Sequence, residues 1–257
     1  MTTTHYRDAA LRLVLLFFVL SSLSSCVGLM RVERNKGFVR VRGERKRIIC
    51  IDPSVDFSEV LLKGASSAPF DKATQLGNKL FREAMSSNAY KNDIYVTAID
   101  SRILAPDDTV YFKYVAQLKN DILQATILQD VSGDEERVKI SFWKSLSEGR
   151  TVRDMRTVTP IPPRHGFLRR YHSTPYFAVQ GIKFFAKANF NVASILVPPN
   201  LVMSLANPDL EAFYYVIVAD VDTSTVVYRE YRKVNMRNNK TDLNGLLYDS
   251  FGLMSHD

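Results

Sequence analysis

The sequence predicts an α/β (α+β) fold: a single domain in which helices flank a mixed β-sheet, with a C-terminal β-hairpin followed by a helix. Two patterns carry this prediction. Apolar residues recur every three or four positions in segments 71–87 and 106–125, as on one face of a helix. The other apolar runs are short or alternate with polar residues, as strands do. The chain has 257 residues and only two cysteines, so its stability has to come from a core rather than from disulfides.

The first part of the predicted domain alternates strands and helices. Phe38–Val41 and Arg47–Asp52 are expected to be strands, and the second is nearly continuous in apolar residues, as a buried strand would be. Asp71 stands where the N-cap of a helix ending near Ser87 belongs. Ile94–Ile99 is expected to be the next strand.

The middle of the chain has the weaker patterns. Pro106-Asp107-Asp108 is expected to open a second helix that runs to about Ala125. Alternation over 138–142 predicts a further strand. Residues 145–175 contain prolines and several basic residues but no clear period, so we expect a long loop or lid there.

The last part of the chain has strongly β-like patterns. Tyr176–Phe185 and Phe213–Val221 are expected to be strands, the latter in the centre of the sheet. Asp222–Thr225 has the residues of a turn, and Val226–Val234 then returns as the second strand of a hairpin. The charges of that return strand predict an edge strand with one face in water. Thr241-Asp242 can cap a last helix.

The N-terminus has the three-part pattern of a secretory signal peptide. Arg7 and Arg12 precede the apolar run Leu13–Leu20, and a small, serine-rich segment follows it. The alternative is an uncut membrane span over 13–30, which has no charge, although a span needs about 20 mostly apolar residues and the serines dilute this one. We expect residues 1–25 to be the signal peptide.

Leu23-Ser24-Ser25-Cys26 resembles the lipobox of bacterial lipoproteins, in which an aliphatic residue and two small residues precede a cysteine. The resemblance implies that Cys26 carries lipid, palmitate among its acyl chains, and becomes the first residue of the mature chain. Several acyl chains give stable membrane anchoring without a span. Val27 follows in place of the aspartate of lipoproteins retained at the inner membrane, so the resemblance implies an outer-membrane anchor facing the periplasm.

Three segments are therefore expected: the signal peptide, a basic tether and first strand over 26–46, and an α/β globular domain over 47–257. Removal of residues 1–25 lowers the net charge from +7 by one, to +6. Between residues 31 and 47 eight basic residues face two acidic ones. That excess can attract anionic headgroups beside a lipid anchor, or it can belong to a solvated tether or edge strand.

The segment from Phe213 to Tyr248 resembles the closing hairpin of curli-secretion and penicillin-binding-protein-activator lipoproteins, where a strand, an Asp/Thr turn and a return strand are followed by a helix. It departs from that pattern at Ser224, where a glycine is usual. The wider pattern resembles uncharacterised Bacteroidetes-type lipoproteins. These resemblances imply an assembly or regulatory factor and transfer no catalytic residue.

The sequence contains few groups for catalysis. Of the four histidines, His165 and His172 lie in one basic segment, and Cys50 lies in an apolar strand where a buried structural thiol is expected. Asp52 and Asp56 follow a strand end, where turn residues are common and α/β ligands also bind. No motif of a metal site, phosphate loop or nucleophile elbow is present, so we expect no metal and no cofactor.

The best candidate for a binding site is a basic-aromatic segment. Arginines with aromatic residues form interface anchors and recognise carboxylate or phosphate groups, and here the candidates are Arg164, His165, Arg169, Arg170, Tyr171 and Tyr176. A solvated basic loop is the alternative. An exported chain without a basic-aromatic nucleic-acid module is not expected to bind nucleic acid.

The sequence thus predicts a non-catalytic cell-envelope lipoprotein that binds another envelope protein or a cell-wall polymer. Two alternatives stay open. One is a secreted hydrolase of unrecognised fold that uses His165, His172 or Cys50, and the other is a signal-anchored membrane protein.

Overall fold

The computed structural model of the chain describes the following residues: 30–39, 45–62, 64, 67–99, 109–129, 150–155, 158–162, 175–186, 210–234 and 243–255. The predicted signal peptide, Cys26 and the predicted strand at 138–142 lie outside them.

Within the described ranges, nine strands form one mixed sheet: β1 (Met30–Arg34), β2 (Lys46–Ile51), β3 (Ser54–Asp56), β4 (Ile94–Ile99), β5 (Arg150–Asp154), β6 (Thr159–Pro160), β7 (Tyr176–Ala186), β8 (Leu210–Asp220) and β9 (Thr225–Val234). Their order is β4-β2-β7-β8-β9-β1-β5, with β3 beside β7 and β6 beside β9. β2 pairs in parallel with β4 and β7, and β1 in parallel with β5. From β7 through β8 and β9 to β1 the strands are antiparallel. The predicted α/β class with a mixed sheet is confirmed.

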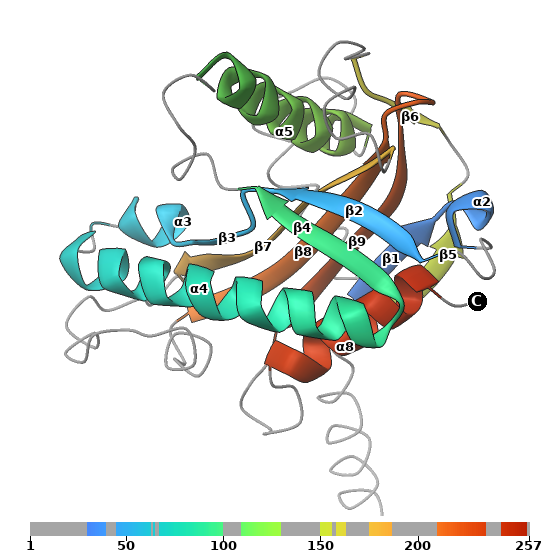
Figure 1. Ribbon diagram of the computed structural model, residues 1–257. Helices are drawn as coiled ribbons and strands as arrows, with labels where there is room; N and C mark the ends of the chain where they lie inside the picture. The colour runs from blue at the N-terminus through green and yellow to red at the C-terminus, as the bar shows by residue number, and fades with distance from the viewer. Residues whose placement is uncertain are drawn as a thin grey trace, which may run out of the picture.

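Five helices are described with this sheet: α2 (Lys36–Val39), α3 (Ser58–Leu61), α4 (Ser67–Lys91), α5 (Thr109–Gln129) and α8 (Leu243–Ser255). Figure 1 shows α4 and α8 packed on one face of the sheet and α5 on the other. The final hairpin, β8 and β9, followed by α8, has the arrangement that the sequence predicts.

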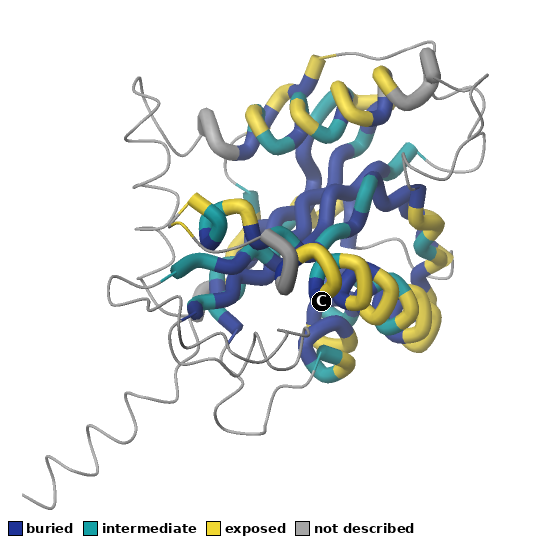
Figure 2. The backbone as a smooth tube through the Cα atoms, turned by 90° about the vertical axis from the view of Figure 1, so that its left-hand side faces the viewer, coloured by how far each residue is buried: buried dark blue, intermediate teal, exposed yellow. Residues whose placement is uncertain are grey.

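Each face of the sheet has its own core. Phe81, Met85 and Phe251 belong to the cluster under α4 and α8, whereas Leu118 and Ile122 belong to the cluster under α5. Figure 2 shows the central strands almost wholly buried between helices whose outer surfaces are exposed. Helix periodicity in the sequence therefore identifies the correct inward faces of α5 and α8. On α4 it identifies Phe81 and Met85 correctly, but Leu76 and Leu80, which the same period predicts on the apolar face, are exposed.

The prediction that the return strand of the hairpin lies at an edge is wrong. β9 lies between β8 and β1, and Arg229 and Glu230 are 6% and 0% exposed. The N-terminal segment supplies the missing neighbour, because Met30–Arg34 pairs with β9 on one side and with β5 on the other. Part of the segment expected to be a tether and first strand is therefore an interior strand of the sheet.

The expected strand at Phe38–Val41 is also wrong in its described part, because Lys36–Val39 forms one helical turn. Asn35 causes the turn: its Oδ1 accepts a hydrogen bond from Gly37 N (2.8 Å), and its carbonyl accepts one from Phe38 N (3.1 Å). The Asn35 cap thus stabilises a helical turn, although the apolar residues that follow it favour a strand.

α4 is longer than the predicted helix, which was expected to start at Asp71 and end near Ser87. It begins at Ser67, so Asp71 lies inside the helix, and Pro69 lies in the first turn, where a proline is tolerated. At its other end, Asn88 Nδ2 donates to Asn244 Oδ1 (3.0 Å), and Asn92 Nδ2 donates to the Tyr248 carbonyl (3.2 Å). Contact with α8 thus extends the helix.

The segment 145–175, expected to be a loop or lid, contains two strands in its described parts. β5 pairs with β1, and β6 pairs with Val226 and Thr225 of β9. Their partners lie far away in the sequence, so no local pattern signals them. Residues 163–174 lie outside the described ranges.

A kink joins β2 to β3 along the side of β7. Asp52 takes a left-handed conformation (φ 42°) between the two strands. β3 then runs beside Gly181, where a Cβ atom would lie 2.4 Å from the Ser54 carbonyl oxygen and 2.8 Å from the Tyr215 hydroxyl. Only glycine fits at this contact, because the carbonyl oxygen belongs to the backbone and cannot rotate away.

We therefore expect Gly181→Ala to lower the free energy of unfolding by about 1–3 kcal/mol through overpacking. Gly252→Ala in α8 is the matched control: its Cβ would meet only Asn92 Oδ1 at an ordinary 3.5 Å, so it should stabilise the protein by up to about 1 kcal/mol. Urea unfolding of the mature protein measures both. Equal stability of the wild type and Gly181→Ala would contradict the close approach.

Candidate functional site

A pocket of about 530 Å³ lies at the end of the sheet where the β8–β9 hairpin turns; we call it the hairpin pocket. The residue before α2, α2 itself, the start of β7 and the hairpin form its walls. Among the binding residues predicted from the sequence, Tyr176 lines it. The full lining is Asn35, Gly37, Phe38, Met155, Val158, Tyr176, Asp220, Thr223, Thr225, Val226 and Val227.

Tyr176 is fixed against the wall of the hairpin pocket by an aromatic contact. Its ring meets that of Phe38 edge-on, with the centroids 5.0 Å apart. Burial raises the pKa of Tyr176, and the carboxylates of Asp220 and Asp222 raise it further. The phenol therefore stays protonated at neutral pH and can donate a hydrogen bond to a partner.

The hairpin turn gives the pocket a preformed rim. Asp220 Oδ1 accepts hydrogen bonds from Asp222 N (3.0 Å) and Thr223 N (3.3 Å), and the hydroxyls of Thr223 and Thr225 lie 2.8 Å apart. Ser224 lies at the position where the closing hairpin of the lipoproteins named above usually has glycine. It takes the left-handed conformation (φ 51°) that glycine would favour. The substitution thus keeps the turn geometry at the cost of local strain.

The other predicted binding residues, Arg164, His165, Arg169, Arg170 and Tyr171, lie outside the described ranges, as does His172. The residues that flank them are described. Ile161 N donates to the Ser224 carbonyl (2.8 Å), and Val221 N donates to the Pro175 carbonyl (3.0 Å). Ile161 and Pro175, described residues on either side of the basic-aromatic segment, therefore lie at the hairpin turn, beside the pocket that contains Tyr176.

Cys50 is a buried free thiol, as the sequence predicts. Its Sγ lies 4.0 Å from Gln180 Oε1. Burial raises the pKa of the Cys50 thiol to about 12, so almost no thiolate forms at neutral pH. A nucleophile needs the thiolate, and this argues against the use of Cys50 in hydrolysis.

A second pocket, of about 510 Å³, lies beyond the carboxyl end of β2. This is a switch point of the sheet, since β2 has parallel neighbours on both sides, and ligands of α/β proteins bind at such points. Asp52, Asp56, Asn78, Arg82 and Lys119 are among its lining residues.

Several polar groups of this second pocket already serve the fold. Asn78 Oδ1 accepts from Val55 N (2.7 Å), Asp56 Oδ1 accepts from Ser58 N (2.8 Å), and Lys119 Nζ donates to the Asp52 carbonyl (3.3 Å). Asp52 and Asp56 thus both act as turn residues, in line with the commoner role of aspartates at strand ends.

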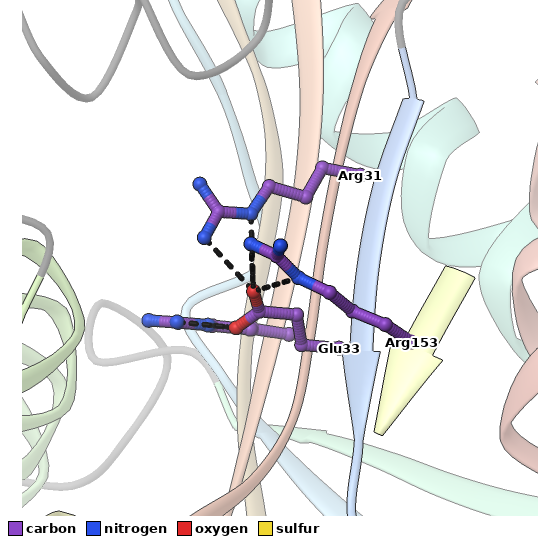
Figure 3. Close-up of polar contacts among 4 residues, drawn as sticks. Arg31, Glu33 and Arg153 are labelled. Carbon is purple, nitrogen blue, oxygen red and sulfur yellow. Dashed lines mark hydrogen bonds and ion pairs between the residues drawn. The ribbon is translucent and has the colours of Figure 1, made fainter. Parts of the chain in front are cut away.

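A buried ion cluster joins β9, β1 and β5 on the face toward α5 (Figure 3). Glu33 Oε1 accepts hydrogen bonds from Arg31 Nη2 (2.8 Å) and Arg153 Nε (2.8 Å), and its Oε2 accepts one from Arg229 Nε (2.5 Å). Burial acts to raise the pKa of Glu33, but Arg229 and Arg31 outweigh it and lower the pKa to about 2. The carboxylate is therefore ionised at all physiological pH values.

A second buried network lies on the opposite face, between the sheet and α8. The fully buried Glu230 accepts hydrogen bonds from Tyr228 (2.7 Å), Ser250 (2.6 Å) and Arg232. Ser250 also contacts the hydroxyl of Tyr214 at 2.8 Å, which in turn accepts from Gln180 Nε2 (2.7 Å). Burial and the charge of Glu230 raise the pKa of both tyrosines, so they stay neutral.

Neither network is predicted from the sequence. The charges of β9 indicated a surface strand, and nothing in the sequence signalled that β1 would cover it. The available signal was the cluster of tyrosines among those charges, because buried charges need hydrogen-bonding neighbours.

In the part of the chain that the structure describes, no group of three histidine, cysteine or acidic side chains is placed to hold a metal ion. Within the same ranges, no helix is long and apolar enough to cross a membrane.

Comparison with known proteins identifies no family. No family model matches the chain, and no curated protein matches it. Among solved structures, the PelC dodecamer from Paraburkholderia phytofirmans matches with a TM-score of 0.37 and 7% identity over 90% of this chain and 99% of that one. A leucine-to-methionine variant of the same dodecamer matches with a TM-score of 0.34 and 8% identity over the same shares. These scores are too low to transfer a fold family or a function.

The Glu33 cluster should make stability depend on acid. A carboxylate whose pKa falls from 4.5 to about 2 on folding stabilises the protein fully above pH 4.5, and this stabilisation is lost as the pH falls toward 2. This contribution to the free energy of unfolding is at most about 3 kcal/mol. Solvent around the half-exposed Arg153 screens its charge and makes the contribution smaller. Glu33→Gln should be less stable at pH 7 and lose less between pH 5 and 2. The free energy of unfolding of both proteins would be measured by urea unfolding between pH 5 and 2. An equal loss in the two proteins over that range would contradict the prediction.

Proposed function

We propose that this protein is a non-catalytic lipoprotein of the cell envelope, anchored through Cys26, that binds another envelope protein or an envelope polymer. The observation that carries the proposal is Leu23-Ser24-Ser25-Cys26, directly after the apolar run of the N-terminus. The outer membrane, with the domain in the periplasm, is the proposed location.

The hairpin pocket supports a binding role. It has a preformed rim, a neutral phenol and an apolar wall, and it lies beside Ile161 and Pro175, described residues on either side of the basic-aromatic segment. These groups can hold a partner by packing and hydrogen bonding. The pocket's described walls contribute no thiol, histidine or lysine that would act as a nucleophile or base.

The chemistry of the segment favours an anionic partner. Arg164, Arg169 and Arg170 lie within seven residues of one another, and guanidinium groups bind carboxylates and phosphates through paired hydrogen bonds. Tyr176 and Tyr171 add aromatic contact area, which anchors many interfaces. Acidic protein surfaces and acidic cell-wall polymers both present such groups.

Lipid anchoring is tested by metabolic labelling with a clickable palmitate analogue, followed by membrane fractionation. The wild type should be labelled and retained in the membrane, and Cys26→Ala should lose both properties because no other thiol precedes the domain. Cys50→Ala is the matched control and should keep both. Membrane retention without label in either protein would instead identify the N-terminus as an uncut span.

Partner binding is tested by crosslinking in intact cells, with Arg169→Glu and Arg170→Glu combined in one variant. We expect recovery of the crosslinked partner to fall at least several-fold, because two favourable charge contacts become repulsive. Lys72→Glu with Lys79→Glu, both exposed on α4, makes the same charge change far from the hairpin and should leave recovery unchanged. Equal recovery from both variants would place the binding face elsewhere.

A further inference from the structure

The distance between the lipid and the folded domain is limited by the covalent chain. Met30 is the first residue of β1 and pairs with both Arg232 and Arg150, so it is fixed inside the sheet. Cys26 precedes it by four positions. Even a fully extended chain spans at most about 3.6 Å per residue, so the lipidated residue lies within about 14 Å of Met30.

The sheet register shows which end of the domain Met30 occupies. Met30 lies opposite Arg232, two residues before the end of β9, and Arg232 lies opposite Tyr214, the fifth residue of β8. The start of β8 and the end of β7 lie four residues further in the direction away from the hairpin turn, where Ala186 pairs with Leu210. We call this the proximal end of the sheet. The hairpin turn is six residues further along β8 from Tyr214, about 20 Å away at the rise of a β-strand.

We propose that the proximal end faces the phospholipid headgroups of the membrane and that the hairpin pocket is held on the side away from the membrane. This inference rests on the proposed lipidation of Cys26. It defines a second interaction surface, for a lipid bilayer, distinct from the proposed partner site at the hairpin.

The described side chains of the proximal end suit a headgroup layer. Lys233 Nζ donates to Glu211 Oε1 (2.6 Å) and lies 5.8 Å from the centre of the Phe213 ring. Lys183 pairs with Glu59 (3.2 Å) and lies 5.5 Å from the centre of the Phe185 ring. Amphipathic lysines beside aromatic rings are compatible with a membrane interface. Because these lysines are paired with carboxylates, the acyl chains rather than anionic lipids have to supply the attraction.

A short link also restricts the partner. A domain on a long flexible linker samples many orientations, but here the reach of the link is smaller than the length of the sheet. The hairpin pocket is consequently presented at a nearly constant height, which suits a partner that is itself membrane-bound or that forms a layer close to the membrane.

The orientation is tested by depth-dependent quenching. Single variants Ala186→Cys at the proximal end and Thr223→Cys on the exposed hairpin turn would be labelled with a maleimide fluorophore under native conditions. Cys50 does not compete, because it is buried and its pKa is raised to about 12. The lipidated full-length mature protein would be reconstituted into phosphatidylcholine vesicles carrying a nitroxide on the headgroup. Quenching should be several-fold stronger at position 186 than at position 223.

The matched control inserts a twenty-residue Gly/Ser segment between Val27 and Gly28. Such a linker has a root-mean-square length of about 25 Å, so the difference between the two positions should largely disappear. Equal or reversed quenching in the protein without the insertion would overturn the orientation. A difference that appears only in vesicles with phosphatidylserine would overturn the claim that acyl chains hold this end.

Flotation of the vesicles separates the two proposals. Protein that floats with the vesicles but shows no difference between the positions keeps its lipid anchor and loses the proposed orientation. Protein that does not float has no anchor, which overturns the proposed function and the orientation with it.

Discussion

Strand β9 buries charge on both of its faces, and the compensation of that charge is the constraint on which the rest of the sheet depends. On one face Arg229 meets Glu33, and on the other Glu230 meets Arg232 and the hydroxyls of two further residues. An uncompensated buried charge costs several kcal/mol. Arg232 belongs to β9 itself, but Glu33 belongs to β1 and Ser250 to α8, so full compensation of the buried charges of β9 requires both of these distant elements.

This constraint links the N-terminus to the core. β1 supplies Glu33 and begins at Met30, so the chain leaves the proposed anchor and enters the sheet, between β9 and β5, within four residues. The basic residues of this region accordingly have different roles. Arg31 stabilises the buried Glu33, whereas Lys36, on the outside of α2, forms an exposed ion pair with Asp154. Net charge alone does not distinguish these roles.

The two pockets differ in the side chains that they present. In the pocket beyond β2, the side chains of Asn78 and Asp56 accept backbone hydrogen bonds, which is a structural role. In the hairpin pocket, Asp220 holds the turn, while the hydroxyl of Tyr176 belongs to a half-exposed side chain at the pocket wall. A phenol beside an apolar wall is suited to contact with a partner surface. This wall is consistent with the proposed partner site at the hairpin.

The sequence by itself determined the inward faces of α5 and α8, the strand Ile94–Ile99, the central strand β8 and the buried Cys50, because periodicity, turn residues and apolar runs are local properties. It also contains Leu23-Ser24-Ser25-Cys26, which resembles a lipobox. A linear motif of this kind does not depend on the tertiary structure. Only the tertiary structure decided that β9 is interior, since β1 is nearly 200 positions away from it. A bulge decided which face each residue takes: Val226 and Tyr228 pair with consecutive residues of β8, so Val227 is extra and joins the core under α8. The hairpin pocket likewise depends on α2, whose helical turn one asparagine side chain imposes against the propensity of its neighbours.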